Sequence, residues 1–159
     1  MVSKRRLCIT PCGAKKIWDK QPDAGVTQAQ DVYIGAFANA CQAYANVFFE
    51  QWVILSAKHG VLFPTDLLAE NYDVAFNSDP ALVIPVEQLR EQWLALGLRD
   101  VEEVVVLGGK KYVQAVERLF AGWSLHPHIV TPLRGLKGIG YMLQALQGAV
   151  QQRVEIDPE

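Results

Sequence analysis

Residues 52–60 read WVILSAKHG, an apolar run that ends in a lysine, a histidine and a glycine. The continuous apolar residues 52–55 are typical of a strand that is buried on both faces of a parallel sheet. Gly60 then marks a turn. The pattern predicts a strand over residues 52–57 with Lys58 and His59 at its carboxyl end, where open α/β sheets bind their ligands.

Strand and helix patterns alternate along the rest of the chain. Continuous apolar runs buried between amphipathic helices predict a mostly parallel central sheet with helices on both faces, which is a three-layer α/β/α arrangement. Further strands are expected at residues 7–10, 103–107 and 126–133, and helices at residues 31–48, 85–96, 113–120 and 141–150.

Length and composition are those of a single folded domain. The chain has 159 residues, half of them hydrophobic and 20% charged, so we expect one α/β domain over residues 1–159. Three cysteines (Cys8, Cys12 and Cys41) without a CxxC motif indicate reduced thiols. The basic start lacks a signal-peptide core and no apolar run is long enough to span a bilayer, so we expect a cytoplasmic protein with no membrane partner. The oligomeric state stays open.

Four loops that follow the predicted strands combine cations with glycines: PCGAKK, SAKHG, GGKKY and PLRGLKGIG. Right-handed crossovers place these loops at one edge of the sheet. Cations beside bare glycine N–H groups and helix N-termini are suited to phosphate. Alternatively, the lysines are only solvated and the glycines only permit the turns. The candidate ligand-binding residues in these loops are Lys15, Lys16, Lys58, Gly108, Gly109, Lys111 and Arg134, with Lys110 and Lys137 as further cations.

Two pairs of residues are candidates for chemistry. Cys12 and His59 suit a thiolate nucleophile and its base, and Tyr72 and Asp73 suit stacking on a base and accepting its exocyclic protons. The alternatives are a half-buried thiol with a surface imidazole, and an aromatic plug beside a turn aspartate. We expect the lysines to lower the pKa of His59, and Cys12, His59 and Tyr112 to border one pocket.

Histidines offer little for a metal. His126 and His128 alternate along one predicted strand, but two histidines without a nearby third ligand rarely bind zinc. We therefore expect no metal and no cofactor.

Five segments resemble the YaaA-like family of bacterial and phage proteins that is named for peroxide stress. They are TPCGAKK, DVYIGAFANACQAYA, WVILSAKHGVLFPTDLLAENYD, VVVLGGKKY and PLRGLKGIG. The layout is more distantly similar to the uracil-DNA-glycosylase-like domain of archaeosine synthase. This resemblance implies a uracil-DNA-glycosylase-like fold and a nucleobase or nucleic-acid setting. The residues it implies for the site are Cys12, Lys15, Lys16, Ser56, Lys58, His59, Tyr72, Asp73, Gly108 and Tyr112.

These observations lead to two competing hypotheses. The first is a nucleobase- or nucleotide-processing enzyme, either a modifying transferase or a glycosylase-like hydrolase, that holds the phosphate of a nucleotide, DNA or RNA. The second is a non-catalytic nucleotide- or nucleic-acid-binding module or a DNA-protective stress-response protein. Cys12 distinguishes them, because chemistry needs its thiol whereas binding tolerates serine at this position.

Overall fold

A computed structural model of the chain describes residues 4–157. Its centre is a five-stranded sheet in the order β4-β3-β1-β6-β7. β4 runs antiparallel to β3, and the other neighbouring strands are parallel, as the sequence predicts for most of the sheet. The strands are β1 (Arg6–Pro11), β3 (Trp52–Ser56), β4 (Gly60–Leu62), β6 (Glu103–Val106) and β7 (His128–Val130).

The three central strands owe their position to their continuous apolar runs. In β1, β3 and β6, residues that point to opposite faces of the sheet are equally buried, as in Leu7 with Cys8 and Val53 with Ile54. Cys8 pairs with Trp52 on one side and with Val105 on the other. The carboxyl ends of these parallel strands therefore meet at one edge of the sheet.

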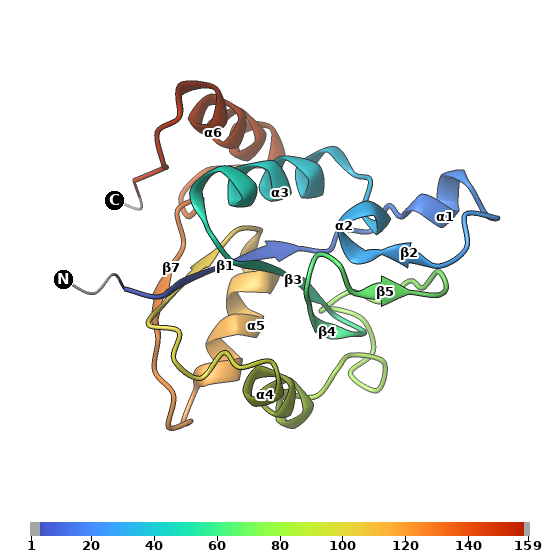
Figure 1. Ribbon diagram of the computed structural model, residues 1–159, viewed down its shortest axis with the longest axis horizontal. Helices are drawn as coiled ribbons and strands as arrows, with labels where there is room; N and C mark the ends of the chain where they lie inside the picture. Colours follow the sequence, from blue (N-terminus) through green and yellow to red (C-terminus); the bar gives the residue numbers. More distant parts are fainter. Residues whose placement is uncertain (1–3, 158–159) are drawn as a thin grey trace.

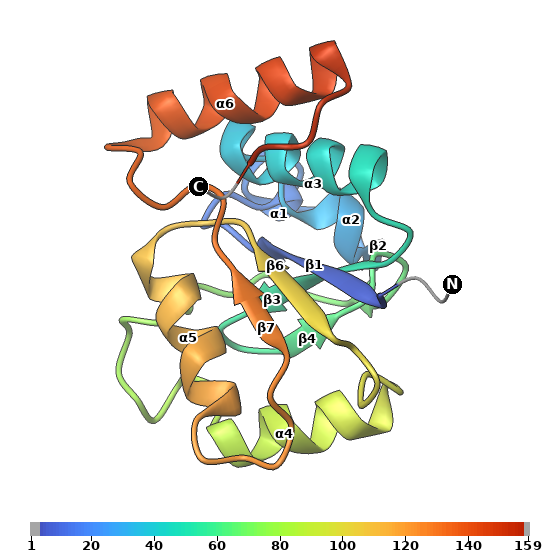
Figure 2. The same ribbon diagram turned by 90° about the vertical axis from the view of Figure 1, so that its left-hand side faces the viewer.

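Helices cover both faces of the sheet. Figure 2 shows α3 (Ala36–Phe48) and α6 (Ile139–Gln152) on one side and α4 (Val86–Ala95) and α5 (Lys110–Phe120) on the other. α4 lies within the predicted helix over residues 85–96; it begins after Pro85, and Gly97 follows its end with a φ of 73°. Within residues 4–157, no helix combines the length and the apolar character needed to cross a membrane.

The predicted helix over residues 31–48 is wrong in its first turns. α2 (Ala29–Val32) ends early, and extended backbone precedes α3. This backbone pairs with the loop after β1, because the Ile34 N–H donates to the Lys15 carbonyl at 3.1 Å. A helix cannot continue through residues whose N–H groups bond elsewhere. The interruption places Tyr33 in the core.

The long segment between β3 and α4 contains short strands of its own. It contains β4 and β5 (Leu67–Leu68), and β5 pairs antiparallel with β2 (Thr27–Gln28). Figure 1 shows this small sheet, with the short α1 (Ile17–Lys20) nearby, at the end of the molecule opposite β7. After β5 the chain returns to the strand ends, where Tyr72 is buried.

Candidate functional site

A buried group of polar side chains lies at the carboxyl ends of β1, β3 and β6, and we call it the polar cluster. Its side chains come from the loop after β1, the last residue of β3, the backbone between α2 and α3, the segment after β5 and the first turn of α5. Buried polar groups cost free energy unless they are bonded to one another, so their contacts define the cluster. Its members are Cys12, Lys16, Tyr33, Ser56, Tyr72 and Tyr112.

Ser56 and Tyr72 organise the end of β3. The Ser56 hydroxyl oxygen accepts hydrogen bonds from the backbone N–H groups of Lys58 at 3.3 Å and His59 at 3.0 Å. Its own proton is therefore available to the Tyr72 hydroxyl, 2.8 Å away. The Tyr72 hydroxyl is also hydrogen-bonded to that of Tyr33. This serine thus holds the turn that carries Lys58 and His59 and links it to two tyrosines.

Cations surround the Tyr72 ring. The Lys16 ammonium lies 4.4 Å from the ring centroid and donates to the Ala14 carbonyl at 2.9 Å, although this lysine is only 2% exposed. The Lys58 ammonium lies 5.5 Å from the same centroid, and the His59 ring meets Tyr72 edge-on at 4.9 Å. A base that stacked on Tyr72, as predicted, would have to displace one of these groups.

His59 and Cys12 have different partners. Burial, followed by the nearby Lys58, lowers the pKa of His59, so the direction agrees with the prediction while its main cause is burial. The Cys12 sulfur lies 3.3 Å from the Tyr112 hydroxyl, whereas the His59 ring contacts Tyr72. The structure thus pairs the thiol with Tyr112 and the His59 ring with Tyr72.

Tyr112 is fixed by contacts on several sides. Its hydroxyl accepts a hydrogen bond from the Gly13 N–H at 3.3 Å, and burial raises its pKa above the ordinary tyrosine value. Gly108 has a φ of 131°, and a Cβ there would lie 3.1 Å from the Tyr112 ring. Phe76 packs edge-on against the same ring at 5.5 Å. The bare backbone of Gly108 therefore makes room for the ring.

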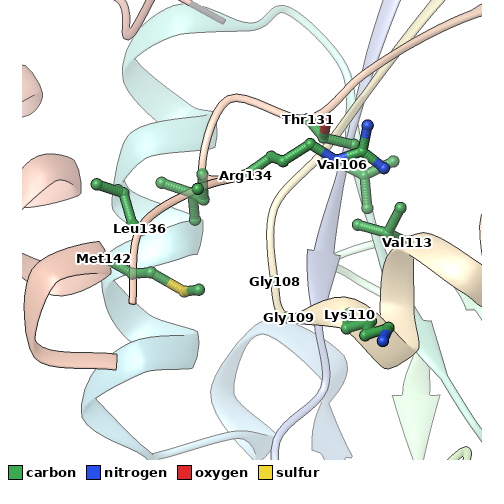
Figure 3. A pocket seen from close by; sticks show the side chains of 11 residues that line it. Val106, Gly108, Gly109, Lys110, Val113, Thr131, Arg134, Leu136 and Met142 are labelled. Atoms are coloured by element: carbon green, nitrogen blue, oxygen red, sulfur yellow. The ribbon is translucent and has the colours of Figure 1, made fainter. Parts of the chain in front are cut away.

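A cavity of about 320 Å³ lies at the carboxyl ends of β6 and β7, and we call it the α5 cavity. Figure 3 shows Leu136 and Met142 on one side of it and Val113 on the other, with Arg134 extending toward Thr131. The charged side chains that line it, Lys110 and Arg134, are both cationic. Backbone and apolar groups complete the lining: Val106, Gly108, Gly109, Leu133 and Gly135.

The N-terminus of α5 adds to this positive environment. Its N-cap residue, Gly109, has no side chain to bond the first free N–H groups of the helix. These N–H groups and the helix dipole favour an anion at this end. The arrangement is chemically suited to a phosphate with an apolar body attached.

The predicted ligand-binding residues divide between these two places. Gly108, Gly109 and Arg134 line the α5 cavity, whereas the polar cluster contains Lys16, Ser56, Tyr72 and Tyr112, with Lys58 beside it. Lys111 does not line the cavity, and its ammonium lies 5.6 Å from the centroid of the Tyr112 ring. The neighbouring Lys110 lines the cavity instead.

Lys15 and Asp73 are exposed. Asp73 lines a shallow depression together with Tyr72, Ala14, Asp19 and Asn71. The Cys12 sulfur contacts the Tyr112 hydroxyl and the His59 ring contacts Tyr72, but none of Cys12, His59 and Tyr112 lines the open α5 cavity at this edge. The α5 cavity is therefore not the pocket that we predicted these three side chains to share.

The histidines near β7 are surface groups. His126 and His128 are both exposed, and His128 Nδ1 lies 3.6 Å from the Glu103 carboxylate. In the part of the chain that the structure describes, no three His, Cys, Asp or Glu side chains are grouped to hold a metal ion.

Sequence reasoning missed Tyr33 and the apolar wall of the α5 cavity. Tyr33 fell inside the predicted helix and off its apolar stripe. The signal that could have found it is Gly35, which becomes the N-cap of α3 and separates Tyr33 from that helix. The cavity wall comes from β6, α5, α6 and the loop after β7, and no local pattern relates these residues.

The fold and site together define an α/β protein with a mostly parallel sheet, a buried polar cluster at its strand ends and a cationic cavity beside it. Residues 11–148 match the model of a family of unknown function, DUF6884, and the chain belongs to this family. It is 51% identical over 152 residues to the Uncharacterized protein YfjM of Bacillus subtilis (strain 168), which covers 96% of this chain and 99% of that protein. The family match spans the whole polar cluster and all the lining of the α5 cavity.

Proposed function

We propose that the protein binds a nucleotide, free or within a nucleic acid, with its phosphate in the α5 cavity, and processes it with the polar cluster. The observation that carries this proposal is the α5 cavity itself. Lys110, Arg134 and the uncapped N-terminus of α5 supply positive charge at one place. These are the groups that hold phosphate in other α/β proteins.

The apolar wall favours a nucleotide over inorganic phosphate alone. A volume of about 320 Å³ is at the lower end of the range for small-molecule sites. Val113, Leu136 and Met142 offer carbon surface on which a base or ribose can pack. A ligand with both an anionic end and a flat apolar end satisfies both halves of the cavity.

The position of Tyr112 brings the cavity close to the candidate chemistry. Tyr112 stands in the same first turn of α5 as Lys110, and its hydroxyl touches Cys12. In this proposal Cys12 is the nucleophile and the neutral His59 is the base. Asp73, exposed beside Tyr72, accepts a hydrogen bond from an exocyclic amine of the substrate.

The resemblance of the strand-end loops to YaaA-like proteins and to archaeosine synthase supports the same setting. We infer from this resemblance that the fold is a uracil-DNA-glycosylase-like three-layer α/β/α fold. We infer that the protein acts in the cytoplasm, in keeping with the reduced thiols of Cys8, Cys12 and Cys41.

Thermal unfolding with inorganic phosphate, mononucleotides and short oligonucleotides at low salt tests the proposal. A ligand at a hundredfold excess over its dissociation constant adds about 2.7 kcal/mol to the unfolding free energy, or about 5–10 °C in Tm for a chain of this size. Arg134→Ala and Lys110→Ala should each remove most of the nucleotide-dependent shift. Arg99→Ala is the matched control, because Arg99 is exposed before β6, away from the cavity. No shift with any of these ligands would rule the proposal out.

The second candidate is a non-catalytic binding module or a DNA-protective stress-response protein that uses the same cavity. The burial of Cys12, which is only 3% exposed, favours this alternative. Cys12→Ser decides between the two. The enzyme should lose turnover of the bound nucleotide while keeping its thermal shift, whereas a binding module should show no turnover in either form and an unchanged shift.

A further inference from the structure

The contact between Tyr112 and Cys12 has a defined donor pattern. The Gly13 N–H can only donate, so the Tyr112 oxygen accepts from it at 3.3 Å. The phenol proton of Tyr112 remains available, and the Cys12 sulfur is 3.3 Å away. When Cys12 is a thiol, either atom can donate across this contact. When it is a thiolate, only Tyr112 can donate, and the hydrogen bond becomes charge-assisted.

The surroundings hold the Tyr112 hydroxyl in this position. A side chain at Gly108 would press on the Tyr112 ring, and Phe76, from the long loop after β5, makes a T-shaped contact with the same ring. Burial raises the pKa of Tyr112, so the phenol keeps its proton over the range in which thiols ionise. A donor that is preorganised, protonated and buried stabilises an anion more than mobile water does.

We propose that Tyr112 is a positioning residue that stabilises the thiolate of Cys12 and so sets the reactivity of this thiol. The proton of the thiol passes to solvent or to a base, and Tyr112 keeps its own proton and turns it to the sulfur. This inference rests on the proposed function and deepens it, because it names Tyr112 as the group that activates the nucleophile Cys12. Cys8 and Cys41 are fully buried, the contacts within residues 4–157 give neither of them such a donor, and burial raises the pKa of both.

Tyr112→Phe tests the inference, because it removes the hydroxyl and keeps the ring that packs on Gly108 and Phe76. Thiolate ultraviolet absorbance is titrated in four proteins: wild type, Cys12→Ser, Tyr112→Phe and the double variant. Subtracting the Cys12→Ser curve from the wild-type curve isolates the signal of Cys12 from the other thiols and the tyrosines. Subtracting the double-variant curve from the Tyr112→Phe curve does the same in the absence of the Tyr112 hydroxyl. Loss of a charge-assisted hydrogen bond should raise the midpoint of the Cys12 titration by about one pH unit.

Alkylation by iodoacetamide gives a second readout, with Cys12→Ser identifying the modified residue. At neutral pH we expect the Tyr112→Phe variant to react about threefold to fourfold more slowly, because about tenfold less thiolate is partly offset by the greater nucleophilicity of a more basic thiolate. An unchanged titration midpoint overturns the inference, even if alkylation becomes faster, because Tyr112 would then only cover the thiol. A Cys12 that does not titrate in wild type overturns it as well.

This outcome is separate from that of the proposed function. Nucleotide binding is measured by the thermal shift of the wild-type protein, and the thiolate titration needs no ligand. A missing shift would remove the proposed function and leave the role of Tyr112 standing, and an unchanged midpoint would do the reverse.

Discussion

Replacing Gly60 with alanine tests how the turn after β3 is held. Gly60 has a φ of 79°, and a Cβ there would overlap the side-chain carbonyl oxygen of Gln92 and lie 2.6 Å from Ile84 Cδ1. Gln92 bonds the backbone on both sides of this glycine. Its oxygen accepts from the Val61 N–H at 2.9 Å, and its amide donates to the His59 carbonyl at 2.8 Å.

The expected cost has two parts. The left-handed backbone conformation at this position lowers the free energy of unfolding by about 1 kcal/mol for any residue that has a Cβ. Displacing Gln92 loses two hydrogen bonds to buried or half-buried backbone groups, at about 1 kcal/mol each. The sum of about 3 kcal/mol corresponds to a Tm lower by about 6–12 °C in a chain of this size.

Gly97→Ala is the matched control. Gly97 has a φ of 73°, and a Cβ there meets nothing within 4 Å, so only the backbone strain of about 1 kcal/mol applies. Both variants and the wild type are compared by urea and thermal unfolding. In a Gln92→Ala background, Gly60→Ala should cost less, because the overlap with Gln92 is absent. Equal costs for Gly60→Ala and Gly97→Ala would refute the steric argument.

Three further substitutions examine buried and charged groups. Lys16→Met should leave Tm unchanged or higher, because it removes a buried ammonium whose hydrogen bond goes to the Ala14 carbonyl and not to a carboxylate; a large loss of Tm in thermal unfolding would contradict this. Tyr72→Phe should cost about 2 kcal/mol in urea unfolding, because Ser56 loses its acceptor. Burial, the largest single cause, raises the pKa of Glu103, but the hydrogen bond from Arg6 and the charges of Arg6, Lys4 and His128 together outweigh it, so the net pKa is lowered. This carboxylate therefore stabilises the fold above pH 4.5, its ordinary pKa, and loses that effect as the pH falls through the lower folded pKa. The advantage of wild type over Glu103→Gln, about 1 kcal/mol at neutral pH, should therefore shrink below pH 4.5, and a constant difference would exclude this role.

The sheet was predictable because its signal is local. Continuous apolar runs at β1, β3 and β6 are each sufficient to indicate a strand buried on two faces. The start of α3 was not predictable in this way, because the helix is interrupted by a hydrogen bond from Ile34 to Lys15, which lies in another loop. Pairing between distant segments overrides local periodicity wherever it takes up a backbone donor.

The sequence predicted which loops lie at the carboxyl edge of the sheet, but not which of their side chains line the cavity. Lys110 and Lys111 are adjacent, but successive helix residues point about 100° apart, so the first helical residue decides which lysine enters the α5 cavity. A similar difference separates the exposed Lys15 from the buried Lys16. These choices depend on where a turn begins, which the sequence indicates only to within a few residues.

The position of β1 affects how the protein is made. β1 is the first strand in the chain but the central strand of the sheet, and Arg6 at its start bonds with Glu103, 97 positions later. At about 5–20 residues per second, a ribosome needs about 5–20 seconds to bring β6 to its place beside β1. From the pairing of β1 with β3 until β6 emerges, Leu7 and Ile9 lie on a strand with one unpaired edge, which is the kind of surface that aggregates or recruits chaperones. The nascent chain is therefore most vulnerable between the completion of β4 and the emergence of β6.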